Sequence, residues 1–216
     1  MNDLIFRQVR ILDGSGGAEF IGDVSVREGR INEVGAVTEG LAPGGREISA
    51  EGAVLCPGLI DTHAHDDGAF FRHPGMEFKL SQGVTTVVSG NCGFSAIPAD
   101  PTKDSVAASG GILAGLEGKF TDLDGYYAAA LARQPAINNM MLVGHNTVRS
   151  LVMGDSKSAP NDLQLQEMQR HVTHALEQGA CGFSSGLIYR PGRYSDTAEV
   201  TELAKMAAPF DALYTT

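Results

Sequence analysis

Residues 57–67 read Pro-Gly-Leu-Ile-Asp-Thr-His-Ala-His-Asp-Asp, an apolar segment that leads directly into two histidines. His63 and His65 are two residues apart, and side chains at this spacing on a β-strand point to the same face. Both imidazoles can therefore reach one metal ion, which makes them candidate metal ligands. The alternative is that they are two ordinary histidines at the end of a strand.

A cysteine follows the next predicted strand in the same manner. This strand spans residues 85–90 and is followed by Asn91-Cys92-Gly93. Cys92 thus leaves its strand at the end where the histidines leave theirs, and a thiolate with two imidazoles is a ligand set that zinc accepts. Cys92 is therefore a candidate third zinc ligand, and spacing alone does not decide between this role and the alternative. The alternative is a buried structural thiol, which is how most free cysteines behave.

The wider pattern predicts two parts. Residues 1–53 contain short apolar runs separated by turn residues, the pattern of small β-strands, with a connection at residues 39–46. From residue 54, apolar strands alternate with longer segments of helical periodicity, which is typical of parallel βα units. The predicted strands of this second part are Val54–Thr62, Thr85–Gly90, Asn139–Gly144, Ala180–Ser184 and Ala212–Thr215.

The clearest predicted helix begins after a cap at Asn161 or Asp162 and ends at Gln178. Gly179 follows, where a helix commonly ends in a left-handed residue.

This succession predicts an α/β fold in which residues 54–216 form a TIM-like (β/α)8 barrel, preceded by a small β-sandwich segment in residues 1–53. A complete barrel takes about 250 residues, so residues 54–216 correspond to only about its first half and reach roughly the fifth strand. We therefore expect an open sheet edge and an incompletely covered apolar core.

Composition limits the class of partner. The chain has 216 residues with 16 Lys and Arg against 26 Asp and Glu, a net charge of −10, which argues against nucleic-acid binding. The start has no signal-peptide pattern, and no apolar run has the roughly 18 residues of a membrane span. We expect a cytoplasmic protein that binds no membrane.

Among the three cysteines, Cys56 and Cys181 are expected in the core.

Four segments together resemble the amidohydrolase superfamily, and within it the N-acyl-D-amino-acid deacylases. They are residues 57–67, Ser-Gln-Gly-Val-Thr-Thr-Val-Val at 81–88, Gly-Asn-Cys-Gly at 90–93, and Gly-Phe-Ser-Ser-Gly-Leu-Ile-Tyr at 182–189. The cysteine is the discriminating feature, because most relatives hold their metals with a carboxylated lysine or a glutamate on another strand. The resemblance extends over nearly the whole chain.

The resemblance implies a barrel of the metal-dependent hydrolase type and zinc-dependent hydrolysis of N-acyl-D-amino acids to a carboxylate and a free D-amino acid. It further implies that His63 and His65 contact one metal position and that Cys92 bridges towards a second. Histidines of strands five and six and an aspartate of strand eight, the general base, complete such sites. No residue of this sequence matches them, so we expect these 216 residues to be inactive alone.

Two alternatives remain open at this point. A cyclic-amide hydrolase, such as a hydantoinase or dihydroorotase relative, shares the early His-x-His pair, although Cys92 counts against it. The second alternative is that the chain is a non-catalytic truncated remnant that binds metal weakly or not at all.

Candidate substrate-binding residues follow two later strands. Tyr189 lies in a loop of the kind that lines a barrel mouth and matches the family motif. His145 and Asn146 close the third predicted barrel strand and Arg149 follows closely; these residues either contact a substrate carboxylate or brace a loop. Arg190 and Arg193 are expected to be solvated surface residues, and His171 and His174 to face water from the long helix.

Overall fold

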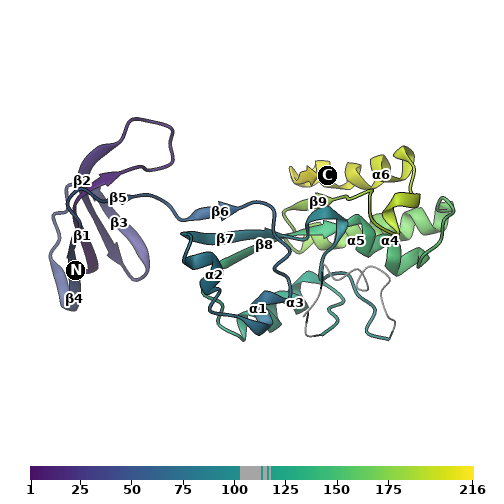
Figure 1. Cartoon of the computed structure of the whole chain (residues 1–216), viewed down its shortest axis with the longest axis horizontal. Helices are drawn as coiled ribbons and strands as arrows, with labels where there is room; N and C mark the ends of the chain where they lie inside the picture. The colour runs from purple at the N-terminus through teal and green to yellow at the C-terminus, as the bar shows by residue number, and fades with distance from the viewer. Residues whose placement is uncertain (103–112, 114–115, 117) are drawn as a thin grey trace. The chain divides into compact units, whose positions relative to one another are not determined.

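The computed structural model describes residues 1–102, 113, 116 and 118–216, which form two units, Met1–Gly58 and Leu59–Thr216. The first unit is one five-stranded sheet around a small core of Val9, Ile11 and Val24 (Figure 1). The small β-strands predicted for this region are confirmed: the first three form an antiparallel meander, and two further strands pair with the first in parallel. The strands are β1 (Asn2–Ile11), β2 (Phe20–Arg27), β3 (Arg30–Gly35), β4 (Leu41–Ser49) and β5 (Val54–Leu55).

Two local predictions for this region are wrong. The segment 39–46 was expected to be a connection, yet most of it belongs to β4, because pairing with β1 outweighs its glycines and proline. The predicted strand Val54–Thr62 is divided: Val54 and Leu55 pair with β1, whereas Leu59–Asp61 belong to the second unit. The division between the units therefore follows Gly58, five residues after the predicted boundary.

The second unit is built on five parallel strands that are neighbours in chain order, as the first strands of a (β/α)8 barrel are (Figure 1). Their carboxyl ends lie at one edge, since Asp61 pairs with Val87, and Gly144 pairs with Ser184. The predicted strands after residue 84 are confirmed within two residues at each end. The strands are β6 (Leu59–Asp61), β7 (Val84–Ser89), β8 (Asn138–Gly144), β9 (Gly182–Ser184) and β10 (Leu213–Thr215).

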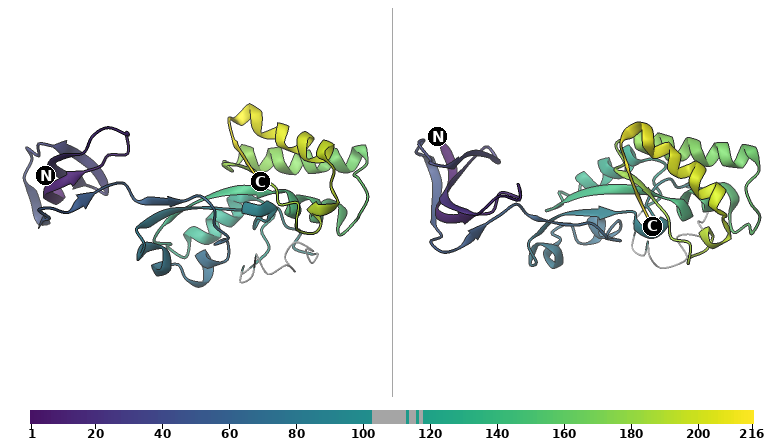
Figure 2. Two further views of the ribbon diagram at one scale, coloured as in Figure 1. Left: turned by 45° about the horizontal axis from the view of Figure 1, so that its top comes forward. Right: turned by 90° about the horizontal axis from the view of Figure 1, so that it is seen from above.

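Helices connect these strands, and the last two long ones, α5 and α6, lie side by side (Figure 2). The sheet residues Val87, Met141 and Phe183 are inaccessible to solvent and share one apolar core with side chains of the surrounding helices. The helical segments are α1 (Ala69–Arg72), α2 (Glu77–Leu80), η1 (Asn91–Gly93), α3 (Leu123–Leu131), α4 (His145–Met153), α5 (Asp162–Glu177), η3 (Gly192–Tyr194), α6 (Thr197–Ala204) and η4 (Lys205–Phe210).

The predicted long helix is confirmed as α5. The Asn161 side chain accepts a hydrogen bond from the Gln164 backbone N–H at 2.9 Å, and the Gln164 side chain accepts one from the Asn161 N–H at 3.0 Å, a reciprocal capping box. At the other end, Gly179 has a φ of 96°, and the Ala180 N–H returns to the Ala175 carbonyl, a Schellman motif.

The first and last strands of the parallel sheet leave apolar side chains uncovered, as predicted. Leu59 and Ile60 of β6 are 56% and 59% exposed, and Leu213 of β10 is 57% exposed. Within the described residues each of these strands pairs with a single neighbour. Among the same residues, none of the helices has the length and apolar composition required to cross a membrane.

Because α5 covers the centre of the parallel sheet, its amino-terminal cap contributes to the stability of the second unit. We expect Asn161→Ala to lower the free energy of unfolding by about 1 kcal/mol, whereas Asn161→Asp keeps a side-chain acceptor and stays near the parent value. Urea denaturation followed by circular dichroism measures both. Equal loss in the two variants would show that the cap is not the cause.

Candidate metal centre

The three predicted metal ligands meet at the carboxyl edge of the parallel sheet. The His63 Nε2 atom lies 3.3 Å from the Cys92 Sγ atom, close to the separation of about 3.5 Å between two ligands of a tetrahedral zinc ion. Ligand atoms of His63, His65 and Cys92 all lie within 4.8 Å of one another. The two imidazole rings stand edge to face with centroids 5.6 Å apart.

The histidine segment is fixed to the neighbouring strand. The Ala64 N–H donates to the Val88 carbonyl of β7 at 3.0 Å, and Ala64 itself is buried. The two candidate ligands flank Ala64 in the sequence: His63 is exposed and His65 is half-buried. An Asp61 oxygen accepts a hydrogen bond from the His63 N–H at 3.1 Å. The anchored backbone thus presents both imidazoles to the same place.

Cys92 sits in an unusual backbone conformation, with φ 55° and ψ 23° inside the turn η1. Two glycines make this turn possible by close approach. A Cβ atom on Gly90 would lie 2.0 Å from the Leu142 carbonyl oxygen of β8, and one on Gly186 would lie 2.2 Å from the Cys92 carbonyl oxygen. The turn therefore packs directly on the ends of β8 and β9, with no room for side chains between.

Two polar side chains hold the same turn. The Asn146 side-chain amide donates to the Cys92 carbonyl at 3.1 Å and to the Gly186 carbonyl at 3.2 Å. The Ser184 hydroxyl accepts from the Gly93 N–H at 3.0 Å and donates to the Gly90 carbonyl. Sequence analysis did not single out Ser184, and it named Asn146 only beside His145 at the end of the third predicted barrel strand. The only available signal was that each stands at or next to the end of a predicted strand.

The donor set fits a zinc ion. Burial raises the pKa of the Cys92 thiol and lowers the pKa of His65, so without a metal both groups are held neutral. A bound cation would instead favour the thiolate form of Cys92. The neutral imidazole of His65 can bind a cation without first losing a proton. The His65 Nδ1 atom is also buried and has no hydrogen-bond partner among the described residues. Two imidazole nitrogens and one sulfur are therefore available to hold zinc.

His145 and Arg149 lie elsewhere, in a cluster buried below α6. The His145 Nε2 atom contacts a Glu199 carboxylate oxygen at 2.8 Å, and Arg149 donates to the other oxygen. Arg149 also donates to the Ser156 and Ser158 carbonyls at 3.2 and 2.8 Å. Side chains of His145, Arg149 and Glu199 are at most 1% exposed. These contacts fit the second possibility raised for His145 and Arg149, in which they brace a loop, rather than contact with a substrate carboxylate.

Tyr189 follows β9 and is 39% exposed. Its ring packs edge to face on Phe94, two residues after Cys92, with centroids 5.3 Å apart. It is thus the candidate substrate-binding residue that stands beside the metal group. The neighbouring Arg190 pairs with Asp155 on the surface.

The remaining predicted positions differ in burial. His171 contacts Glu167 at 3.3 Å, and His174 is exposed. Cys56, predicted to be in the core, is exposed because it lies between β5 and β6 rather than inside one strand, whereas Cys181 is half-buried.

Comparison with known proteins finds related sequences over nearly the whole chain. Residues 46–213 match the model of the Amidohydrolase family. The chain is 42% identical to an N-acyl-D-glutamate deacylase and 38% identical to an N-acyl-D-aspartate deacylase, both of Alcaligenes xylosoxydans xylosoxydans. The matches cover 99% and 94% of this chain and 43% and 40% of those proteins.

A solved structure is similar over the same extent. The crystal structure of the N-acyl-D-glutamate deacylase from Bordetella bronchiseptica, complexed with zinc and a phosphonate inhibitor, matches with a TM-score of 0.90 at 39% identity. The match covers 99% of this chain and 44% of that one. The predicted family and partial barrel are therefore confirmed, and the chain spans less than half the length of these relatives.

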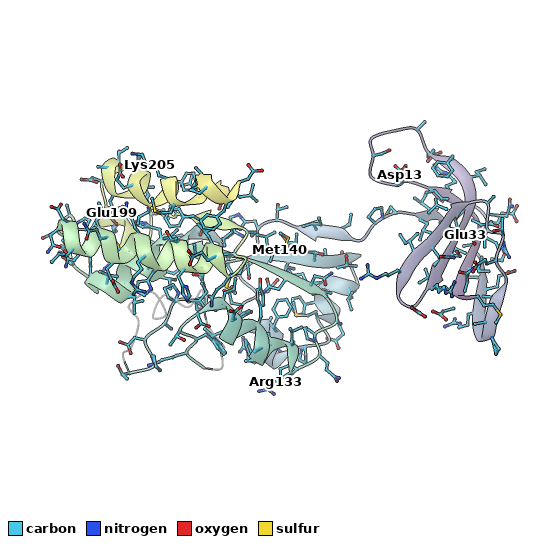
Figure 3. The ribbon with its side chains drawn as sticks, turned by 180° about the vertical axis from the view of Figure 1, so that it is seen from behind. Asp13, Glu33, Arg133, Met140, Glu199 and Lys205 are labelled. Carbon is cyan, nitrogen blue, oxygen red and sulfur yellow. The ribbon has the colours of Figure 1, made fainter. Side chains whose placement is uncertain are left out.

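The buried cluster around Glu199 generates a stability prediction. Glu199→Gln removes the carboxylate that faces the buried Arg149 guanidinium, and an unpaired buried charge costs about 3 kcal/mol or more. Glu202→Gln is the matched control, since Glu202 pairs with the exposed Lys205 at 2.5 Å. Figure 3 marks Glu199 and Lys205 in this C-terminal helical segment.

We expect a large loss in chemical denaturation for Glu199→Gln and little change for Glu202→Gln. Equal effects in the two variants would mean that Glu199 does not compensate the buried charge of Arg149.

Proposed function

The chain belongs to the amidohydrolase family, and we propose on that basis that the protein carrying it hydrolyses the amide bond of N-acyl-D-amino acids. The products are a carboxylate and a free D-amino acid. The observation that carries the proposal is the convergence of His63, His65 and Cys92. It is supported by 42% identity to an N-acyl-D-glutamate deacylase over 99% of the chain. The proposed metal is zinc, the ion in the related Bordetella bronchiseptica complex.

When bound, zinc would polarise the acyl carbonyl and lower the pKa of a water molecule towards neutrality. The residues of this chain would hold the ion and keep it at the carboxyl edge of the sheet. The Ala64 N–H bond fixes the histidine segment to β7, and the Asn146 side chain fixes the Cys92 carbonyl, so the backbone that carries the three donors is held in place. Such preorganisation keeps a reacting group in position at no cost during the reaction.

We propose substrate contact for Tyr189, because it is partly exposed and packs on Phe94 beside the Cys92 turn. For His145 and Arg149 the substrate role predicted from sequence stays a prediction. Their complete burial against Glu199 of α6 favours the bracing role. Gly192, in the segment that carries Tyr189, donates its N–H to the Asn146 side chain at 2.6 Å.

The metal assignment is tested by cysteine replacement. Cys92→Ala removes the sulfur ligand, so we expect tightly held zinc to be lost, whereas Cys56→Ala and Cys181→Ala should retain the parent content because neither thiol belongs to the donor group. Elemental analysis of proteins reconstituted with zinc and then desalted gives the ratio of metal to protein. Equal zinc in all three variants would refute the role of Cys92.

The substrate assignment is tested in the protein that carries this sequence. We expect release of free amine from N-acetyl-D-amino acids, its loss in His63→Ala, and no turnover of N-acetyl-L-amino acids. A hydantoin and dihydroorotate serve as cyclic-amide controls, and turnover of these alone would favour the cyclic-amide alternative. The 216-residue chain by itself is expected to be inactive, and activity that co-purifies with it and disappears in His63→Ala would contradict that expectation.

A further inference from the structure

A lysine stands between two carboxylates that flank the candidate histidine ligands. The Lys79 Nζ atom of α2 lies 2.6 Å from an Asp61 oxygen and 2.9 Å from an Asp66 oxygen. On the premise of the proposed metal function, we propose that Lys79 is a positioning residue: it clamps the segment that carries His63 and His65 and keeps both aspartates away from the metal.

The two aspartates lie at the ends of this segment. Asp61 precedes His63 by two residues, and Asp66 directly follows His65. One Asp61 oxygen binds Lys79 while the other accepts the His63 N–H at 3.1 Å. The same carboxylate therefore connects the lysine to the backbone of a ligand. With Asp66 held by the same ammonium group, both ends of the segment are tied to one point.

The clamp is sheltered from solvent. The side chains of Lys79, Asp61 and Asp66 are 18%, 30% and 17% exposed. Partial burial reduces screening and strengthens each charge interaction relative to a surface pair. It also means that removal of the ammonium group leaves two carboxylates close together with no cation between them. Each would then turn towards another positive group.

The lysine is itself held firmly. Met76, the residue before α2, is fully buried, and its carbonyl accepts the Lys79 N–H at 2.9 Å. Beyond the helix, the Gly83 carbonyl accepts the Leu59 N–H at 2.9 Å, which ties the segment after α2 to the start of β6. Lys79 thus lies on a short helix that is connected to β6, the strand that the two histidines follow.

The chemistry of the freed groups indicates what the clamp prevents. Aspartate oxygens bind zinc at about the same distance as imidazole nitrogens, so a released Asp61 or Asp66 competes with the nitrogen and sulfur donors. Partners that orient metal ligands commonly change metal affinity by about 10–100-fold when they are replaced. We therefore expect the loss of Lys79 to weaken the intended site rather than to strengthen it.

The test is zinc affinity, measured by competition with a chromophoric chelator on the whole chain. Lys79→Ala should weaken zinc binding by about 10–100-fold, and Lys79→Arg, which can still reach both carboxylates, should restore most of it. Asp66→Asn, which breaks one arm only, should give an intermediate loss and remains informative if Lys79→Ala does not fold. Lys205→Ala, which breaks the exposed pair with Glu202, is the matched control and should bind as the parent does.

A second readout separates positioning from general stability. In protein loaded with cobalt, the thiolate absorption band reports Cys92 as a ligand, and it should weaken or shift in Lys79→Ala while the far-ultraviolet circular dichroism of the metal-free chain stays the same. Unchanged or tighter zinc binding in Lys79→Ala, or failure of arginine to restore it, would overturn the inference. If the parent chain binds no zinc, the proposed function fails instead, so the two failures are distinguishable.

Discussion

The close packing of the Gly-Asn-Cys-Gly turn on the ends of the neighbouring strands is the constraint on which the site depends. Gly90 approaches the Leu142 carbonyl and Gly186 approaches the Cys92 carbonyl so closely that neither position has room for a Cβ atom. Because the backbones are in contact, the position of the sulfur follows from the register of β7, β8 and β9. A thiol on a longer or looser loop would not have a fixed distance to the histidines that follow β6.

The turn requires support, since a residue other than glycine at a positive φ costs of order 1–3 kcal/mol. Asn146 and Ser184 provide it with hydrogen bonds to three backbone groups of the turn. Asn146 also accepts the Gly192 N–H in the segment that carries Tyr189. One side chain therefore couples the conformation of the turn that carries Cys92 to the position of the proposed substrate-contacting loop.

Sequence alone predicted that His63, His65 and Cys92 lie together, because strand periodicity and the carboxyl ends of parallel strands are local signals. The family resemblance added the chemistry. The polar contacts around these residues carry no such signal: Lys79 lies on a four-residue helix, and Asn146 lies 54 residues from Cys92. β4 was missed for the same reason, since its pairing with β1 is a long-range interaction that local composition opposes.

The central claim is that this chain supplies one sulfur and two imidazole nitrogens to a single zinc ion. X-ray absorption spectroscopy of the zinc-loaded chain measures the ligand atoms and their distances directly. The account predicts one sulfur at about 2.3 Å and nitrogen ligands at about 2.0–2.1 Å, with the scattering pattern of two imidazoles. A zinc environment made of oxygen and nitrogen alone, with no sulfur at that distance, would contradict it.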